Sequence, residues 1–260
     1  TINDLAMCGA SPRYLSLGLI IEEGLPLDDL SRIVNSIRQI AGDTGVKIVT
    51  GDTKVVNRGS ADKLFINTAG IGIIPPGVNI SGANARPGDK VIISGAIGNH
   101  GVAVMSQREG FRLKIPVASD CAPLDTMVAE MLKYPSAIHC LRDPTRGGLA
   151  TTLNELATQS RVGINIEEGK LVVHQPVSAA CEILGLDPLY IANEGKLVAI
   201  VSPDQADGVL TVMRHNAYGA ESSIIGEVTS EHPGRVVMKT PLGASRIIDM
   251  LTGELLPRIC

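Results

Sequence analysis

The chain of 260 residues has no tryptophan, and aromatic residues make up only 2% of it. Proteins that bind single-stranded nucleic acid stack the bases on aromatic side chains and follow the phosphates with a basic groove. The formal net charge is −4, so the composition does not favour a broad basic face either. The two shortages together argue against nucleic-acid binding.

Paired cysteine motifs and long apolar runs are also missing. Five cysteines are widely spaced, with no Cys-x-x-Cys pair: Cys8, Cys121, Cys140, Cys181 and Cys260. An odd, scattered set favours free thiols in a reducing compartment over a disulfide framework or a zinc site. No apolar run reaches membrane-spanning length and we expect no signal peptide, so the sequence predicts a cytoplasmic protein with no membrane contact.

Hydrophobic residues are plentiful at 44%, enough for a substantial core. Predicted strands and helices interleave without strict βαβ regularity, which favours an α+β fold of mixed α/β layers over a Rossmann sheet. The predicted strands are residues 15–21, 46–50, 63–74, 90–94, 163–168, 196–202, 222–228 and 235–240. The predicted helices are residues 26–42, 102–107, 124–133, 147–159 and 205–214.

A proline-glycine cluster at residues 75–77 is the best candidate for a domain boundary. We therefore predict an N-terminal domain over residues 1–78 and a second domain over residues 79–245. The last stretch, from Leu242 onward, has little that would bury it, and we assign residues 246–260 to a mobile tail.

Gly51-Asp52-Thr53-Lys54 follows the predicted strand 46–50, which we expect to be buried. A carboxylate there can hold a hard cation, and the lysine can neutralise phosphate oxygens. The competing interpretation is an exposed turn, since Gly-Asp is common in turns. Asn3-Asp4 is a similar short polar pair that would offer a second oxygen donor.

The loop Gly95–Gly101 lies between a predicted strand and a predicted helix. Its glycines would let backbone N–H groups approach an anion, although it is neither a Walker loop nor a dinucleotide fingerprint. His100 in this loop could donate to a phosphate or make a purely local hydrogen bond.

Two further polar segments precede regular elements. Residues 142–149 (Arg-Asp-Pro-Thr-Arg-Gly-Gly-Leu) combine two arginines, Asp143 and a Gly-Gly pair, with Thr145 as a plausible helix cap, which favours a phosphate or inter-domain role. Asn193-Glu194-Gly195-Lys196 is either a tight turn or the seat of a general base at Glu194. The loops together describe an ATP user outside the P-loop and Rossmann families.

The chain ends in Pro257-Arg258-Ile259-Cys260, so its last residue is a thiol. A terminus is usually the least ordered part of a domain. Cys260 could therefore carry a group into an active site on a movable arm, or it could simply end a frayed tail.

These motifs and their order resemble the HypE family of hydrogenase maturation proteins. That family belongs to the AIR synthase superfamily, with selenophosphate synthetase and thiamine-monophosphate kinase. The resemblance spans essentially the whole chain, and its specific part is the Pro-Arg-Ile-Cys ending. It implies an AIR synthase-like two-domain fold with a flexible C-terminal tail. Members of the family carry an upstream glycine-rich segment, which we expect to be missing here.

The resemblance also implies an activity, the ATP-dependent dehydration of a carbamoyl group on Cys260 to a thiocyanate. Asp4 and Asp52 would bind Mg²⁺, Lys54 would neutralise the γ-phosphate, and Glu194 would remove the nitrogen proton. The nucleotide contacts that it implies are Asn3, Asp4, Asp52, Thr53, His100, Asp143 and Arg146.

The partners implied are the carbamoyltransferase HypF, the HypC–HypD iron-carrying complex and a second copy of the chain in a homodimer. Two other interpretations stay open. One is an ATP-dependent kinase or synthetase of the same superfamily that acts on a free small molecule. The other is a non-catalytic module for hydrogenase assembly.

Overall fold

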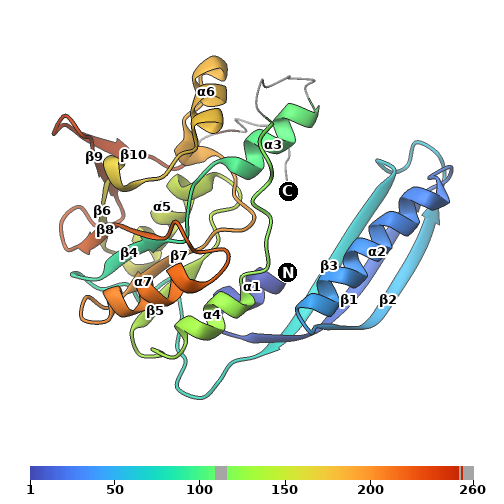
Figure 1. Cartoon of the computed structure of the whole chain (residues 1–260), viewed down its shortest axis with the longest axis horizontal. Coiled ribbons are helices and arrows are strands. Elements are labelled where there is room, and N and C mark those ends of the chain that lie inside the picture. Colours follow the sequence, from blue (N-terminus) through green and yellow to red (C-terminus); the bar gives the residue numbers. More distant parts are fainter. Residues whose placement is uncertain (109–115, 252, 254–260) are drawn as a thin grey trace.

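The computed structural model describes residues 1–108, 116–251 and 253. Its chain builds two sheets that lie well apart (Figure 1). The N-terminal part contains α1 (Ile2–Met7), β1 (Ser11–Glu22), α2 (Leu27–Asp43), β2 (Lys47–Val56) and β3 (Leu64–Ile73). Its sheet has the order β2-β1-β3, with β1 parallel to β2 and antiparallel to β3. Helix α2 runs along this sheet (Figure 1).

The larger sheet has seven strands in the order β10-β9-β6-β8-β4-β7-β5. Its strands are β4 (Lys90–Ile93), β5 (Ile138–Arg142), β6 (Gly163–Glu167), β7 (Val198–Val201), β8 (Ser223–Thr229), β9 (Val236–Lys239) and β10 (Ser245–Ile248). The helices of this part are α3 (Asn99–Arg108), α4 (Asp125–Met131), α5 (Gly148–Ser160), α6 (Gln175–Leu184) and α7 (Ala206–His215), with 3₁₀ turns η1 (Glu168–Lys170) and η2 (Pro188–Tyr190). The α+β fold of mixed layers is confirmed.

Two hydrophobic cores lie on opposite faces of the seven-stranded sheet. On one face, Val91 and Ile93 of β4 pack with Leu149 and Leu153 of α5. On the other face, Ile92 packs with the buried residues of α1, α4 and α7. This alternation follows from the period of two along a strand. It also explains why all four residues of β7 are buried and apolar.

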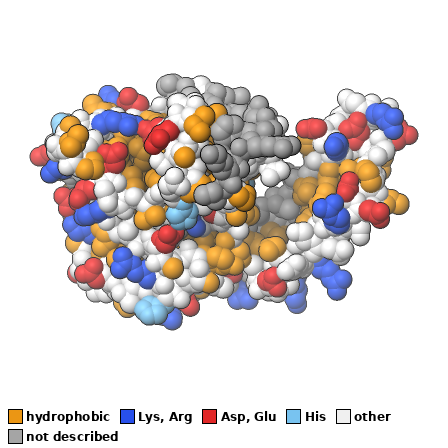
Figure 2. All heavy atoms as spheres, turned by 45° about the horizontal axis from the view of Figure 1, so that its top comes forward, with side chains coloured by type: hydrophobic (Ala, Val, Ile, Leu, Met, Phe, Trp, Pro, Cys, Tyr) orange, Lys and Arg blue, Asp and Glu red, His pale blue; other side chains and the backbone are white. Residues whose placement is uncertain are grey.

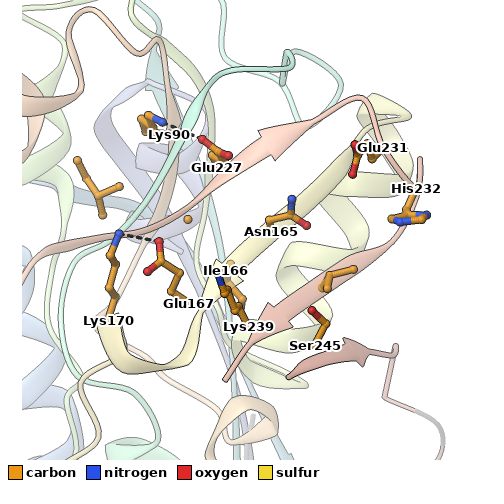
Figure 3. Close-up of a pocket in the computed structure, with 13 residues that line it drawn as sticks. Lys90, Asn165, Ile166, Glu167, Lys170, Glu227, Glu231, His232, Lys239 and Ser245 are labelled. Atoms are coloured by element: carbon orange, nitrogen blue, oxygen red, sulfur yellow. Dashed lines mark hydrogen bonds and ion pairs between the residues drawn. The ribbon is translucent and has the colours of Figure 1, made fainter. Parts of the chain in front are cut away.

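One face of the large sheet is covered over only part of its width. The core that contains α4 and α7 includes no residue of β6, β9 or β10. Polar side chains line the hollow left there, including two ion pairs, Lys90 with Glu227 and Lys170 with Glu167 (Figure 3). None of the predicted site residues lines this hollow.

The N-terminal sheet differs from our expectation for residues 46–50. We expected a buried strand that ends at Gly51, but β2 continues to Val56 and nine of its ten residues are exposed. Large hydrophobic side chains of this sheet are also exposed, among them Tyr14, Val49, Val55, Phe65, Ile71 and Ile73. The apolar content of β2 indicated burial, but the described residues do not cover it. Figure 2 shows hydrophobic side chains over this part of the molecule.

Two α-helices and two strands were not predicted: α1, α6, β5 and β10. The last of these corrects our expectation for the end of the chain. Residues 245–248 form an edge strand on β9, Ile248 is only 1% exposed, and the Ile248 carbonyl accepts a hydrogen bond from Asn154 Nδ2 at 2.9 Å. Any mobile tail therefore begins after β10, and the division into domains at residue 78 stays our proposal.

Helix α5 also begins differently. Its N-cap is Gly147, in the left-handed conformation, without a side-chain capping bond, so Thr145 does not cap it. Among the helices of the described residues, none combines the length and hydrophobicity that a membrane crossing needs.

Candidate active site

Asn193 joins three of the predicted loops. Its side chain is fully buried, and its Oδ1 accepts a hydrogen bond from the Gly98 N–H at 2.7 Å. Its Nδ2 donates to the carbonyl oxygens of Pro144 and Ile191, each at 3.1 Å. The glycine loop after β4, the segment after β5 and the segment before β7 are thus held together by one amide.

Glycines allow these loops to pack closely. A Cβ on Gly101 would lie 2.5 Å from Ile191 Cγ2, and a Cβ on Gly148 would lie 2.5 Å from the Leu189 carbonyl oxygen. Gly148 also has a φ of +60°, which side-chain-bearing residues rarely adopt. At Gly195, a Cβ would overlap the Asp120 carbonyl oxygen. The glycines therefore bring backbones together at this site, a packing role that their sequence spacing does not reveal.

Asn3 brings the N-terminal helix to the same place. Its Nδ2 donates to the carbonyl oxygens of Ala122 at 3.0 Å and of Glu194 at 3.2 Å. Its Oδ1 accepts from the Leu124 N–H at 2.9 Å. Each of these bonds is to backbone, so in this structure Asn3 holds the segment 122–124 and the backbone of Glu194 next to α1.

Glu194 is a partly buried carboxyl among other carboxyls. Burial raises its pKa, and the negative charges of Asp143, Asp120 and Asp4 raise it further. Its Oε1 is buried and has no hydrogen-bond partner among the described residues. Burial and the charge of Asp4 likewise raise the pKa of Asp143. The four carboxyls form one acidic cluster.

Asp120 is a site residue that the sequence analysis missed. Its Oδ1 accepts a hydrogen bond from the Glu194 N–H at 3.0 Å, while its Oδ2 is buried without a partner in the described part of the chain. No local pattern marks this aspartate, because its partner lies 74 positions away. Only the fold brings the two carboxyls together.

The acidic cluster fits a cation. Two buried carboxylate oxygens lack hydrogen-bond partners among the described residues, and burial together with neighbouring negative charges raises the pKa of Glu194 and of Asp143; a bound cation would offset those charges. Among residues 1–108, 116–251 and 253, however, no three His, Cys, Asp or Glu side chains are already arranged around a metal position. The described side chains of the cluster therefore do not form a metal site on their own.

The other predicted residues of this part lie around the cluster. Asp4 is largely exposed and lines a cavity together with Asp143, Arg142, Thr145 and Cys8. His100 Nδ1 lies 2.8 Å from Ser119 Oγ, and burial lowers the His100 pKa, which favours a neutral ring. Arg146 is exposed, just before the cap of α5.

Asp52, Thr53 and Lys54 lie elsewhere, in the exposed strand β2 of the other sheet (Figure 1). The Asp52 carboxylate accepts a hydrogen bond from the Thr53 N–H at 2.8 Å. The structure therefore does not place these three residues beside Glu194. Cys260 lies outside the described residues.

Comparison with known protein families identifies the class of protein to which this chain belongs. Residues 1–74 match the family described as AIR synthase related protein, N-terminal domain. Residues 86–239 match the family described as AIR synthase related protein, C-terminal domain. The two matches cover the smaller sheet and nearly all of the larger one.

Individual relatives identify a narrower family within this class. The carbamoyl dehydratase HypE of Azotobacter vinelandii is 54% identical over the full chain, which covers 76% of that protein. A crystal structure of the hydrogenase maturation protein HypE in complex with ATP is 50% identical, with a TM-score of 0.96, over 100% of this chain and 79% of that one. A crystal structure of a HypE–HypF complex is 49% identical, with a TM-score of 0.94, over 96% of this chain and 82% of that one. The chain belongs to the HypE family of carbamoyl dehydratases, within the AIR synthase related proteins. The family resemblance is confirmed.

Proposed function

We propose that this chain dehydrates a carbamoyl group, carried on the sulfur of Cys260, to a thiocyanate with consumption of ATP. The main support for this proposal is the environment of the Glu194 carboxyl group. This group offers a buried carboxylate oxygen without a hydrogen-bond partner among the described residues, at the point where the Asn3 and Asn193 side chains hold neighbouring segments together. Membership in the carbamoyl dehydratase family and the ATP complex of a relative supply the substrate and the nucleotide.

The reaction balances as two steps. The carbamoyl oxygen attacks the γ-phosphorus of ATP, ADP leaves, and the nitrogen loses its first proton to give an O-phosphorylated imidate. The nitrogen then loses its second proton, the carbon–oxygen bond breaks, and phosphate departs to leave a carbon–nitrogen triple bond on sulfur. Activation by phosphate is necessary because the oxygen of an amide is a poor leaving group. The cyanide formed would pass to the iron of a nickel–iron hydrogenase precursor.

Glu194 is the proposed base for the nitrogen proton. A raised pKa makes a carboxylate a stronger base near neutral pH, which suits proton abstraction. His100, neutral at pH 7, can donate a hydrogen bond to a phosphate oxygen. Asn3, Thr53, Asp143 and Arg146 remain proposed nucleotide contacts.

Lys54 is proposed to neutralise charge on the γ-phosphate and on the carbamoyl oxygen. Asp4 and Asp52 are proposed to hold Mg²⁺. Asp4 fits this role through its place beside Asp143 and Glu194, whereas Asp52 would have to reach the site from β2. When bound, Mg²⁺ offsets the negative charge of the phosphates.

We propose HypF as the carbamoyl donor, in keeping with the HypE–HypF complex of a relative, and HypC–HypD as the cyanide acceptor, all in the cytoplasm. The exposed hydrophobic side chains of the N-terminal sheet support a homodimer that buries this sheet.

Mass spectrometry of the C-terminal peptide tests the reaction. The peptide should gain a carbamoyl group with the donor and lose one water after ATP is added. Cys260→Ala should abolish both changes. Glu194→Gln should keep carbamoylation and slow dehydration at least a hundredfold, the usual order for loss of a general base. The matched control, Glu167→Gln, removes a carboxylate of the hollow shown in Figure 3 and should dehydrate normally.

Two outcomes would contradict the proposal. No mass change at Cys260, with ATP turnover driven by a free small molecule, would support the kinase or synthetase interpretation. Failure to bind Mg-ATP even with the upstream glycine-rich segment restored would support the assembly module.

A further inference from the structure

Another polar cavity lies at the opposite ends of strands β4, β5 and β7 from Glu194. The acidic cluster follows the ends of β4 and β5, whereas this cavity is formed just before β4, near the start of β5 and after β7. The side chains that decide its chemistry are those of Arg86, Asp89, Lys133, His139, Ser202 and Asp204. Neither the motifs nor the proposed reaction uses any of them.

A buried histidine–aspartate pair forms the floor of this cavity. His139 is 9% exposed and Asp89 is 2% exposed. His139 Nδ1 lies 2.7 Å from Asp89 Oδ2, so the ring donates its Nδ1 proton to the carboxylate. Asp89 Oδ2 also accepts a hydrogen bond from the Arg86 N–H at 2.7 Å. Because Nδ1 is engaged by Asp89, the nitrogen left for a ligand is Nε2.

The charged groups around this pair differ in whether they have hydrogen-bond or ion-pair partners. Asp89 is bonded by His139 and by the backbone of Arg86. Asp204 is bonded by the hydroxyl of Ser202 and by Gln205, which lowers the Asp204 pKa. The side chains of Arg86 and Lys133, in contrast, make no ion pair or hydrogen bond with the described residues. The carboxylates have donors, but the two cations have no acceptor within that part of the chain.

We propose that this cavity binds an oxyanion, a phosphate or a carboxylate group, through Arg86, Lys133 and Nε2 of His139. A guanidinium can bind such a group with two parallel hydrogen bonds, and an ammonium adds a mobile positive charge. Asp89 orients the imidazole, as carboxylates do when they accept a hydrogen bond from the other ring nitrogen of a ligand-binding histidine. The site is independent of the carbamoyl chemistry.

Titration of the purified protein with inorganic phosphate tests the site, followed by the ¹⁵N and ¹H resonances of the His139 ring. A second arm uses acetate at constant ionic strength. We expect a saturable shift of the His139 signals in one or both arms, and the arm that saturates at lower concentration identifies the preferred anion.

Arg86→Gln and Lys133→Gln should each weaken this binding roughly tenfold, since each removes a charge-assisted contact. Both residues are exposed, so the variants should unfold at the wild-type urea concentration. The control, Arg38→Gln, removes an equally exposed guanidinium from α2 and should bind like the wild type. Absence of a saturable shift in both arms, or equal shifts in all three variants, would overturn the proposal.

Discussion

The two sheets of this protein differ in what covers them. In the seven-stranded sheet, β7 has helices on both sides and all four of its residues are buried. In the three-stranded sheet, β2 is exposed along nearly its whole length, and α2 has no buried residue at all. Three strands and one helix are close to the minimum for independent stability. The larger sheet therefore supplies its own core, whereas the smaller one leaves large hydrophobic side chains exposed among the described residues.

The largest expected effect is in the core beneath α5. Leu153 is fully buried, so Leu153→Ala should lower the free energy of unfolding by about 2–5 kcal/mol. Val55→Ala in β2, where the side chain is 61% exposed, should cost less than about 0.5 kcal/mol in the monomer. Urea unfolding at low protein concentration measures both. Equal losses would show that the two sheets are covered alike.

Two glycines with positive φ sharpen the same comparison. Gly45, just after α2, has a φ of +68°, and no atom of the described residues lies within 4 Å of the position that a Cβ would take, so Gly45→Ala should cost only the backbone strain. That strain amounts to about 1–2 kcal/mol. Gly148 has the strain and a close backbone contact as well, so Gly148→Ala should cost more. Thermal unfolding ranks the two variants. If Gly45→Ala proves the more damaging, the packing of α5 on η2 is less important than we infer.

Titration of Glu194 is expected to have a smaller effect. Its pKa is raised in the folded state, so its contribution to stability is present at low pH and is lost as the pH rises through the folded pKa. Glu194→Gln should therefore unfold at a higher urea concentration than the wild type at pH 7, and this advantage should shrink toward acid pH. A constant difference across this range would mean that the buried charge is already compensated.

The smallest effect is expected at Glu22, in the N-terminal sheet. Its carboxylate accepts hydrogen bonds from the Gly59 and Lys63 N–H groups, which lowers its pKa. The sign is opposite to that of Glu194: the stabilisation is present above the unfolded pKa and is lost as the pH falls through the folded pKa. Glu22→Gln should speed amide exchange at Gly59 and Lys63 at neutral pH and leave Ile164, in β6, unchanged. Unaltered exchange at all three would contradict this.

Much of the fold could be predicted from local patterns. The residues of α2 repeat at three and four positions, and the helix was predicted within a residue of its observed bounds. Element β5 was missed because Ile138–Arg142 is short and carries a histidine and an arginine. Its burial comes from the helices and the neighbouring strand that cover it, which a local window does not contain.

The residues of the candidate site also fall into two groups, those that local patterns predicted and those that they did not. Glu194 was found because its glycine-marked segment precedes a predicted strand, and Asp143 because its glycine-marked segment precedes a predicted helix. Asp120 was missed, and Asn193 was quoted only as part of a motif, although it holds three loops together. The roles of both depend on partners far away in the chain.

The sequence by itself determined the family, the alternation of elements and the set of polar loops, because motifs and periodicity are local properties of the chain. Only the tertiary structure decided which loops meet. The bond from Asn3 to the Glu194 carbonyl spans 191 positions, and that from Asn193 to Gly98 spans 95. The tertiary structure also decided that Gly51–Lys54 lies in an exposed strand, because the burial of a strand depends on what packs against it and not on its residues alone.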